Sequence, residues 1–210
     1  MKRNIPLLFL LLVTNMVTTH LSAQCNAGAC LSIENVDIGA GTLDVYMTNQ
    51  AGCGYCTDIT YTDPESCENF GNFGQGADWI FDSTMDASAC STADGVFFNG
   101  NISGFQFYMV GMAISSVSGG TANSNLDLLN VTSPSDCDAD GNTDTGCNLV
   151  LGVAFFGGII PPGPDAKLFT ANFTDYNNVS MCFAGTEDIP GGSSSWSKSV
   201  VSDDTGSEVY

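Results

Sequence analysis

Apolar and polar residues alternate with a period of two along much of the chain. Four segments show this alternation and are predicted as half-buried β-strands: residues 41–49, 103–111, 167–174 and 178–183. The segment "CNLVLGVAFFGG", residues 147–158, is apolar on both faces, which predicts a central strand. Clusters of glycine, asparagine, aspartate and proline separate these runs. Many short strands with such punctuation predict an all-β fold, a jelly-roll or immunoglobulin-like β-sandwich.

The segment from residue 50 to residue 99 does not follow this alternation. It holds four cysteines and many glycines, and we interpret it as a disulfide-stapled insertion between two strands. A short helix is predicted near "ADWIFDSTM", residues 77–85. Because no linker or tandem repeat is visible, residues 24–210 are predicted to form a single domain that carries this insertion.

The first 23 residues have the pattern of a secretory signal peptide. Two cations, Lys2 and Arg3, precede an apolar run and a small-residue exit, "LSA", which predicts cleavage before Gln24. The alternative is a lipoprotein in which Cys25 is lipidated, but Gln24 stands where a small residue is needed. We therefore expect a secreted, extracellular protein.

The chain is strongly acidic. Beyond the predicted signal peptide only Lys167 and Lys198 stand against 23 acidic residues, which leaves a net charge of −21. Nucleic-acid binding needs lysine and arginine to neutralise phosphates, so that class of partner is excluded. An anionic membrane surface should repel the chain as well. Hydrophobic residues at 43% and charged residues at 13% indicate a folded protein rather than a disordered one.

All nine cysteines lie beyond residue 23, in a chain bound for an oxidising compartment. Most of them are therefore expected in disulfides. The predicted pairs are Cys25 with Cys30, Cys137 with Cys147, Cys53 with Cys56, and Cys67 with Cys90. The odd number leaves one thiol that is free, buried or paired between chains, and we assign this role to Cys182.

The sequence argues against the common catalytic mechanisms. The one histidine, His20, lies inside the predicted signal peptide, which excludes Ser-His-Asp and Cys-His catalysis and histidine-containing zinc sites. The motif "CGYC", residues 53–56, has the spacing of a redox dithiol, but the following "TDITYTDPESC" does not predict the helix that such a motif needs. Glycoside hydrolysis requires a pair of carboxylates, and nothing in the sequence pairs the scattered glutamates. We expect a protein without enzymatic activity.

An acidic loop, "SDCDADGNTDTGC", spans residues 135–147. Its spacing matches the first half of calcium-binding loops, in which alternate side chains converge and a glycine permits the turn. The candidate metal ligands are Asp136, Asp138, Asp140, Asn142 and Asp144. Cys147 stands where an EF-hand needs its closing glutamate, and no helices flank the loop, so an EF-hand is excluded. Two interpretations remain: a disulfide-stapled hairpin tip that binds one structural Ca²⁺, or an acidic tip whose carboxylates point into solvent.

Four N-x-[ST] sequons are candidate sites of N-glycosylation, at Asn101, Asn130, Asn172 and Asn178. In a host that glycosylates asparagine, glycans at these sites would coat the rims of the strands. In another host the sequons carry no meaning.

Several motifs resemble those of the cohesin-like β-sandwich modules of secreted microbial proteins. They are "LSIENVDIGAGTLDVYMTN", "ISGFQFYMVGMAISSVSGGTA", "LVLGVAFFGGIIPPGPDAKLFTANF", "VSMCFAG" and "SVVSDDTGSEVY". The insertion over residues 50–99 and the aspartate loop depart from the pattern. The resemblance implies a jelly-roll-like sandwich used in extracellular assembly or adhesion, and it does not imply an enzyme.

We therefore expect a secreted, non-catalytic structural subunit of an extracellular filament or surface assembly. Such a subunit would self-associate head to tail, with the N-terminal arm, residues 24–37, added as a strand to a neighbour's open sheet edge. The alternative is a calcium-dependent adhesion module that binds carbohydrate or protein. Exposed aromatics such as Trp79, Tyr108 or Trp196 would form its contact face, although such residues more commonly pack in a core or at a rim.

Overall fold

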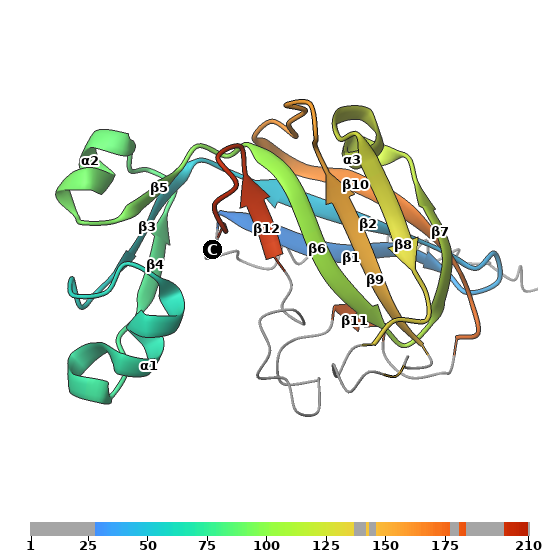
Figure 1. Cartoon of the computed structure of the whole chain (residues 1–210), viewed down its shortest axis with the longest axis horizontal. Helices are drawn as coiled ribbons and strands as arrows, with labels where there is room; N and C mark the ends of the chain where they lie inside the picture. Colours follow the sequence, from blue (N-terminus) through green and yellow to red (C-terminus); the bar gives the residue numbers. More distant parts are fainter. Residues whose placement is uncertain (1–27, 137–141, 143–145, 177–180, 184–199, 210) are drawn as a thin grey trace, which may run out of the picture.

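The alternating segments form the two sheets of a β-sandwich in the computed structural model of this chain (Figure 1). The structure describes residues 28–136, 142, 146–176, 181–183 and 200–209. One sheet, here called the β2–β10 sheet, has the order β1-β2-β10-β7. Its strands are β1 (Ala29–Asp37), β2 (Thr42–Asn49), β10 (Gly163–Thr174) and β7 (Ala113–Ser118).

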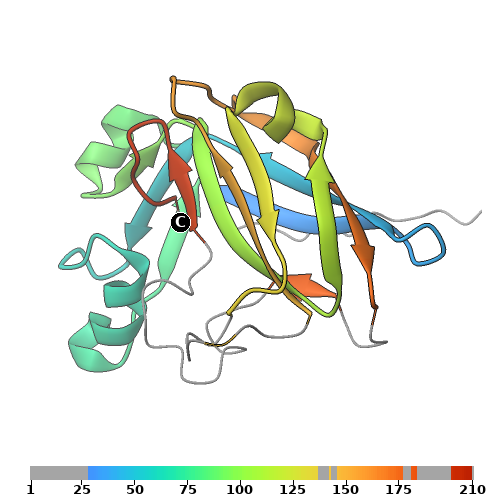
Figure 2. The same cartoon turned by 45° about the vertical axis from the view of Figure 1, so that its right-hand side comes forward.

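The other sheet, here called the β6–β9 sheet, faces the first across the core (Figure 2). Its strands are β6 (Ile102–Val110), β9 (Cys147–Val153), β8 (Leu128–Thr132), β11 (Cys182–Phe183) and β12 (Val200–Asp203). Both β11 and β12 pair with β6, while β9 lies between β6 and β8. The apolar segment that includes β9 was predicted as a central strand, and the sheet order confirms this. A short helix, α3 (Gly120–Asn125), connects β7 to β8.

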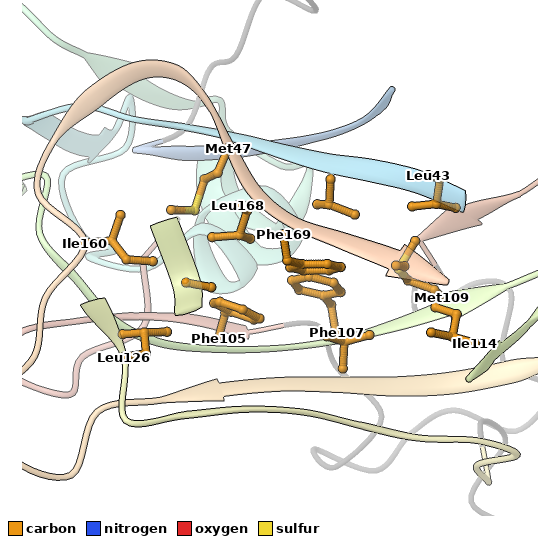
Figure 3. Close-up of a cluster of buried hydrophobic side chains, with 14 of the residues drawn as sticks. Leu43, Met47, Phe105, Phe107, Met109, Ile114, Leu126, Ile160, Leu168 and Phe169 are labelled. Atoms are coloured by element: carbon orange, nitrogen blue, oxygen red, sulfur yellow. The ribbon is translucent and has the colours of Figure 1, made fainter. Parts of the chain in front are cut away.

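The core forms where the apolar positions of the alternating strands meet (Figure 3). Leu43, Val45 and Met47 of β2 are all buried, as the period of two predicts. Phe107 of β6 and Phe169 of β10 come from opposite sheets, and their ring centroids lie 6.0 Å apart in a stacked arrangement. Burying each such ring contributes roughly 1.5–3 kcal/mol. The fold class predicted from the sequence, an all-β sandwich, is therefore confirmed.

The insertion forms a small lobe at one end of the sandwich (Figure 1). Its elements are β3 (Gly52–Cys56), α1 (Pro64–Gly74), β4 (Trp79–Asp82), α2 (Ala87–Thr92) and β5 (Val96–Phe98). The three strands pair in the order β4-β3-β5. The prediction of a helix near residues 77–85 was wrong, because this segment contains β4. The helices start elsewhere: the carboxylates of Asp63 and Asp86 cap α1 and α2 by accepting hydrogen bonds from Ser66 N and Ala89 N, both at 2.8 Å.

Two disulfides hold the lobe together, and they differ from the predicted pairs. Cys53 bonds to Cys90 of α2, and Cys56 bonds to Cys67 of α1. The predicted pairs Cys53 with Cys56 and Cys67 with Cys90 were wrong. Cys53 and Cys56 stand three positions apart in one strand, so their side chains point to opposite faces and cannot meet. Each of the two cysteines of β3 is therefore disulfide-bonded to a cysteine of a different helix.

Asn49, at the end of β2, fixes the lobe to the sandwich. Its buried side-chain amide donates hydrogen bonds to Gly100 O at 2.6 Å and to Pro161 O at 2.9 Å, and lies 3.4 Å from Ile160 O. Gly100 follows the last strand of the lobe, whereas Pro161 belongs to the loop between β9 and β10. One side chain thus joins the entry and the exit of the lobe to a loop of the sandwich.

Candidate functional site

The aspartate loop lies between two strands that pair with each other. β8 and β9 are antiparallel neighbours, which confirms that strands flank the loop. Of the five predicted metal ligands, Asp138, Asp140 and Asp144 lie outside the described residues. Within the described part of the chain, no three histidine, cysteine, aspartate or glutamate side chains form a group that could hold a metal ion. Calcium binding by this loop stays a prediction.

The described end of the aspartate loop lies close to the outer face of the β6–β9 sheet. Burial, together with the negative charge of Asp136, raises the pKa of Tyr108 on β6. Cys147, at the start of β9, is disulfide-bonded. Its predicted partner, Cys137, lies outside the described residues.

The remaining cysteines agree with the sequence analysis as far as the structure describes them. Cys30 is disulfide-bonded, and its predicted partner, Cys25, lies outside the described residues together with the predicted signal peptide. Cys182 is the free thiol of the described part of the chain and is half-buried on β11. The prediction that Cys182 is the odd cysteine is confirmed for the described residues.

Three of the four sequons fall on described residues. Asn130 is exposed on β8, and Asn172 is exposed on β10, where its amide donates to Ser116 Oγ at 3.0 Å. Asn101 precedes β6, and its amide donates to the Asp204 carboxylate at 2.9 Å. Asn178 lies outside the described residues. The side chains of Asn130 and Asn172 are therefore accessible from the solvent.

Two of the three aromatic residues that the sequence suggested as a contact face, Trp79 and Tyr108, are not exposed in the structure. Tyr108 is buried, so its prediction as an exposed aromatic was wrong, because the outer face of β6 is covered at this position. Trp79 packs on the buried Cys56 and Cys67, and Trp196 lies outside the described residues. The sequence-based prediction did not include the phenylalanines that are exposed among the described residues, which are Phe70, Phe73, Phe97, Phe155 and Phe156. They stand in segments without strand alternation, so no periodic signal marks their exposure.

Most of the proposed N-terminal arm is part of its own sheet. Residues 29–37 form β1, which pairs antiparallel with β2, so they do not extend away from the domain as a free arm. Residues 24–27 lie outside the described residues. The arm was expected to pair with a neighbour's sheet, but its residues 29–37 pair with β2 of the same chain. The relevant feature is therefore the outer edge of β1.

The outer edge of β1 is not paired with any described strand. Gly28 O accepts a hydrogen bond from Gln50 N at 2.9 Å. Hydrogen-bonded pairs alternate along an antiparallel ladder, so the even-numbered residues of β1 bond to β2. The N–H and C=O groups of Ala29, Leu31 and Ile33 then point outward, toward the open edge.

The two halves of this edge differ in charge and regularity. Residues 29–33 carry no charge, and their register with β2 is regular. The register shifts after Glu34, where Asn35 has a φ of +49°, and the strand ends at Asp37. Charges and bulges are devices that protect an edge from further pairing. The first half of β1 has neither, so it is the part of the edge that can accept another strand.

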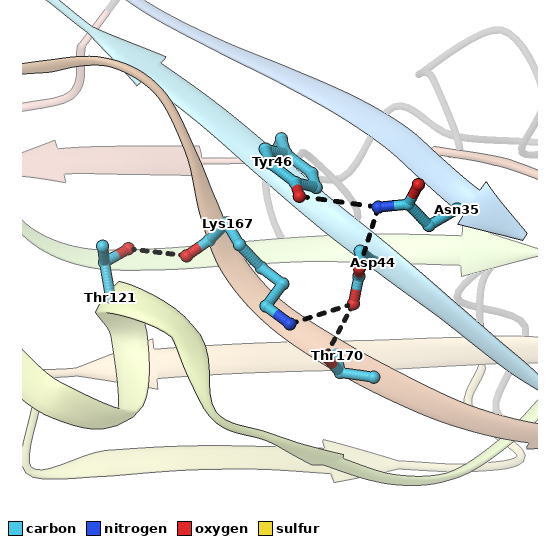
Figure 4. A network of polar contacts seen from close by, with 6 residues as sticks. All are labelled: Asn35, Asp44, Tyr46, Thr121, Lys167 and Thr170. Carbon is cyan, nitrogen blue, oxygen red and sulfur yellow. Dashed lines mark hydrogen bonds and ion pairs between the residues drawn. The ribbon is translucent and has the colours of Figure 1, made fainter.

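The outer face of the β2–β10 sheet is polar (Figure 4). Asp44 accepts hydrogen bonds from Thr170 Oγ1 at 2.6 Å and from Asn35 Nδ2 at 3.0 Å, and its carboxylate lies 3.5 Å from Lys167 Nζ. Partial burial raises the pKa of Asp44, but these hydrogen bonds and the lysine together lower the pKa below its usual value. This face has the character of an ordinary solvated sheet surface.

The outer face of the β6–β9 sheet is much less polar. Because Phe105 and Phe107 point into the core, Gly104 and Gln106 lie on the outer side of β6. Half-buried apolar residues from the neighbouring strands share this side: Leu128, Leu149, Leu151, Val153 and Val200. Antiparallel sheets usually have one polar, solvated face, so this apolar face is the more unusual surface of the sandwich.

A shallow groove of about 340 Å³ runs along this apolar face. Its lining, from β6, β9 and β12 and the residues next to them, holds no charged side chain: Ser103, Gly104, Phe105, Gln106, Leu151, Gly152, Val153, Ala154, Val200 and Ser202. Gly104 lies on the outer side of β6 opposite Val153 and contributes no side chain to this region, whereas Gly152 lies on the core side, against Phe105 and Leu126. The groove is suited to an apolar or neutral group rather than to an ion.

Comparison of the chain with protein-family models, curated proteins and solved structures yields no match. The similarity to cohesin-like modules therefore consists of the short motifs alone. None of the helices described in the structure is both long enough and apolar enough to cross a membrane.

Proposed function

We propose that this protein is a secreted structural subunit of an extracellular filament or surface assembly. The observation that carries the proposal is the regular, uncharged outer edge of β1 over residues 29–33. An edge of this kind is a template for a strand from another chain. The strand order β1-β2-β10-β7 would then continue from one copy of the protein into the next.

The energetics indicate that the edge needs support from a second contact. Three residues direct N–H and C=O groups outward, and about six added backbone hydrogen bonds contribute roughly 0.5–1.5 kcal/mol each. Bringing two molecules together costs about 4–15 kcal/mol. The two quantities are similar in size, so edge pairing alone gives a weak association and apolar burial elsewhere must add to it.

The charge of the chain sets the conditions for assembly. Copies of the chain from Gln24 onward, with a net charge of −21, repel one another. Salt shortens the range of this repulsion to about 8 Å at physiological ionic strength. We therefore expect assembly to increase with ionic strength, because the proposed contact residues 29–33 are themselves uncharged.

The test uses the chain from Gln24 onward, produced with its disulfides. L31P removes an outward-facing N–H at the centre of the edge, and proline is tolerated at such edge positions. L31A is the matched control, because it loses a similar apolar side chain but keeps the N–H. Negative-stain microscopy and sedimentation velocity should show polymers for the unmodified chain and for L31A, and monomers for L31P, with the folded circular dichroism spectrum retained in all three.

Two results would reject the proposal. One is a monodisperse monomer of the unmodified chain at high concentration and physiological salt. The other is assembly by L31P with the same concentration dependence as L31A, because this would mean that the β1 edge takes no part.

A calcium-dependent adhesion module that binds carbohydrate or protein is the second candidate function. It is favoured by one observation: the apolar outer face of the β6–β9 sheet adjoins the aspartate loop, since the charge of Asp136 acts on Tyr108 of β6. A screen of glycans and secreted proteins, with and without a calcium chelator, tests this alternative. A saturable ligand that is released by the chelator would favour the adhesion module over the filament subunit.

A further inference from the structure

A second pocket lies between the end of β2, the helix α3 and the loop that leads into β10. Its volume is about 230 Å³, which is room for roughly eight groups the size of a water molecule. Met47 and Ala166, which are paired neighbours on β2 and β10, form part of its apolar wall. Among the described residues that line this pocket, none carries a charge. The pocket is therefore suited to a small ligand with an apolar part.

The polar side chains of this pocket have already used their hydrogen-bond donors. The amide Nδ2 of the buried Asn49 donates to two backbone carbonyl oxygens, at 2.6 and 2.9 Å. The amide Nδ2 of Asn125 donates to Thr121 O at 2.8 Å, and the hydroxyl group of Thr121 donates to Lys167 O at 3.3 Å (Figure 4). In the part of the chain that the structure describes, no hydrogen bond is donated to the side-chain oxygens of these three residues. What they offer a ligand is three acceptor oxygens.

The backbone around the pocket is also poor in donors. Pro161, Pro162 and Pro164 line the pocket, and a proline has no N–H group, so its backbone can only accept hydrogen bonds. The N–H group of Ile160, another lining residue, already donates to Ile102 O at 2.8 Å. A ligand that only accepts hydrogen bonds, such as a carboxylate or a phosphate, would find few partners here. A group that only donates hydrogen bonds matches this lining.

We propose that this pocket binds a primary ammonium group carried on a short aliphatic chain. Such a group has three N–H donors and no acceptor, and its aliphatic chain can pack along the apolar wall. The charge of the protein favours the same ligand, because the chain from Gln24 onward has a net charge of −21 and attracts cations. Lys167 does not oppose this attraction, since its Nζ lies 3.5 Å from the Asp44 carboxylate on the outer face of the sheet (Figure 4).

The main competing ligand is a neutral sugar. Each sugar hydroxyl group donates one hydrogen bond but also has lone pairs that need donors, and this lining leaves them unmatched. A neutral molecule also gains nothing from the negative charge of the protein. Both the donor count and the charge therefore favour the ammonium group. The inference goes beyond the proposed function and does not depend on it, because binding needs no second copy of the chain.

The test is a nuclear magnetic resonance titration of the isotope-labelled chain from Gln24 onward, with its disulfides intact. The probes are n-butylammonium, its neutral analogue n-butanol, and methyl glucoside. n-Butylammonium should shift the amide signals of residues 121–125 and 163–166 with a dissociation constant of about 1 mM. It should bind about tenfold or more tightly than n-butanol, and added salt should weaken the binding of the ammonium probe alone.

N125A and N123A are the matched variants. Both replace an asparagine of α3 by alanine, but Asn125 lines the pocket whereas Asn123 is exposed and outside it. N125A should weaken the binding of n-butylammonium by about tenfold or more, as expected for the loss of one hydrogen bond to a charged group. N123A should leave the binding unchanged. T121V removes a second acceptor oxygen and should weaken the binding in the same way, with the spectrum of the folded chain retained.

An end-blocked Gly-Lys-Gly peptide distinguishes the two sources of such a group. Tighter binding of this peptide than of n-butylammonium would assign the pocket to a lysine side chain of a protein partner, and weaker binding would assign it to a free amine. Absence of n-butylammonium binding, equal binding of n-butanol, binding of methyl glucoside alone, or unchanged binding by N125A would each overturn the inference. None of these results depends on polymer formation, so the pocket and the proposed filament function can fail separately.

Discussion

Replacing Asn49 by aspartate tests how the lobe is held on the sandwich. The two side chains have almost the same shape, but an ionised aspartate has no hydrogen to donate. In the native chain the amide donates to Gly100 O at 2.6 Å and to Pro161 O at 2.9 Å, inside the protein. In N49D both carbonyl oxygens lose their donor and face a carboxylate instead.

The expected loss in the free energy of unfolding follows from these contacts. Each buried carbonyl left without its donor costs about 1–3 kcal/mol, and a buried carboxylate without a partner adds to this cost. We expect N49D to lower the free energy of unfolding by about 3–5 kcal/mol at neutral pH. N49L also removes the two hydrogen bonds but introduces no charge, so it should cost about 2–4 kcal/mol.

The two variants differ in how their stability depends on pH. Burial against carbonyl oxygens raises the pKa of the carboxyl group that N49D introduces, so the folded state binds its proton more tightly than the unfolded state. The destabilisation by N49D should therefore be largest at pH 8 and shrink as the pH falls toward 5.5. The difference between N49L and the unmodified chain should stay constant over this range.

Urea titrations followed by tryptophan fluorescence, with the disulfides intact, measure these free energies. N123D, at an exposed position of α3, controls for the added negative charge and should change the free energy of unfolding by less than about 0.5 kcal/mol. The reasoning would be refuted if N49D cost no more than N123D. It would also be refuted if the N49D effect did not change with pH.

Three further predictions concern the acidic groups and the cysteines. The free energy of unfolding should decrease below about pH 4, because the pKa of Asp44 is lower in the folded chain than in the unfolded one, and D44N should reduce this slope in acid urea titrations. Peptide mapping without reduction should recover Cys53 linked to Cys90 and Cys56 linked to Cys67. The double variant C56S/C67S should lower the free energy of unfolding by about 3 kcal/mol, as expected for a loop of 11 residues. If the aspartate loop binds Ca²⁺, calcium at about one hundred times its dissociation constant should raise the free energy of unfolding of the chelator-treated chain by about 2.7 kcal/mol. D140N should abolish this stabilisation. An unfolding midpoint that calcium does not change would exclude the site.

Local sequence patterns predicted the main strands correctly, whereas the helix was predicted at the wrong place. The alternation in residues 41–49 and 103–111 corresponds to β2 and β6, because a strand with one buried face must place its apolar residues at every second position. The start of α1 was also present in the sequence as "TDPES", with an aspartate cap followed by proline. The helix was predicted near residues 77–85 instead, but this segment contains β4, which pairs with β3.

The sequence by itself determined the sandwich, the stapled insertion and the acidic, lysine-poor surface, because alternation, cysteine content and charge are properties of neighbouring or summed residues. Tertiary structure decided the disulfide pairs, since Cys53 and Cys56 point to opposite faces of one strand and each meets a cysteine of a different helix. It also decided that β1 completes its own sheet while leaving residues 29–33 open, and that a fully exposed Phe73 and a neutral groove occur on separate parts of the chain. These features depend on contacts between residues far apart in sequence, and no local pattern encodes them.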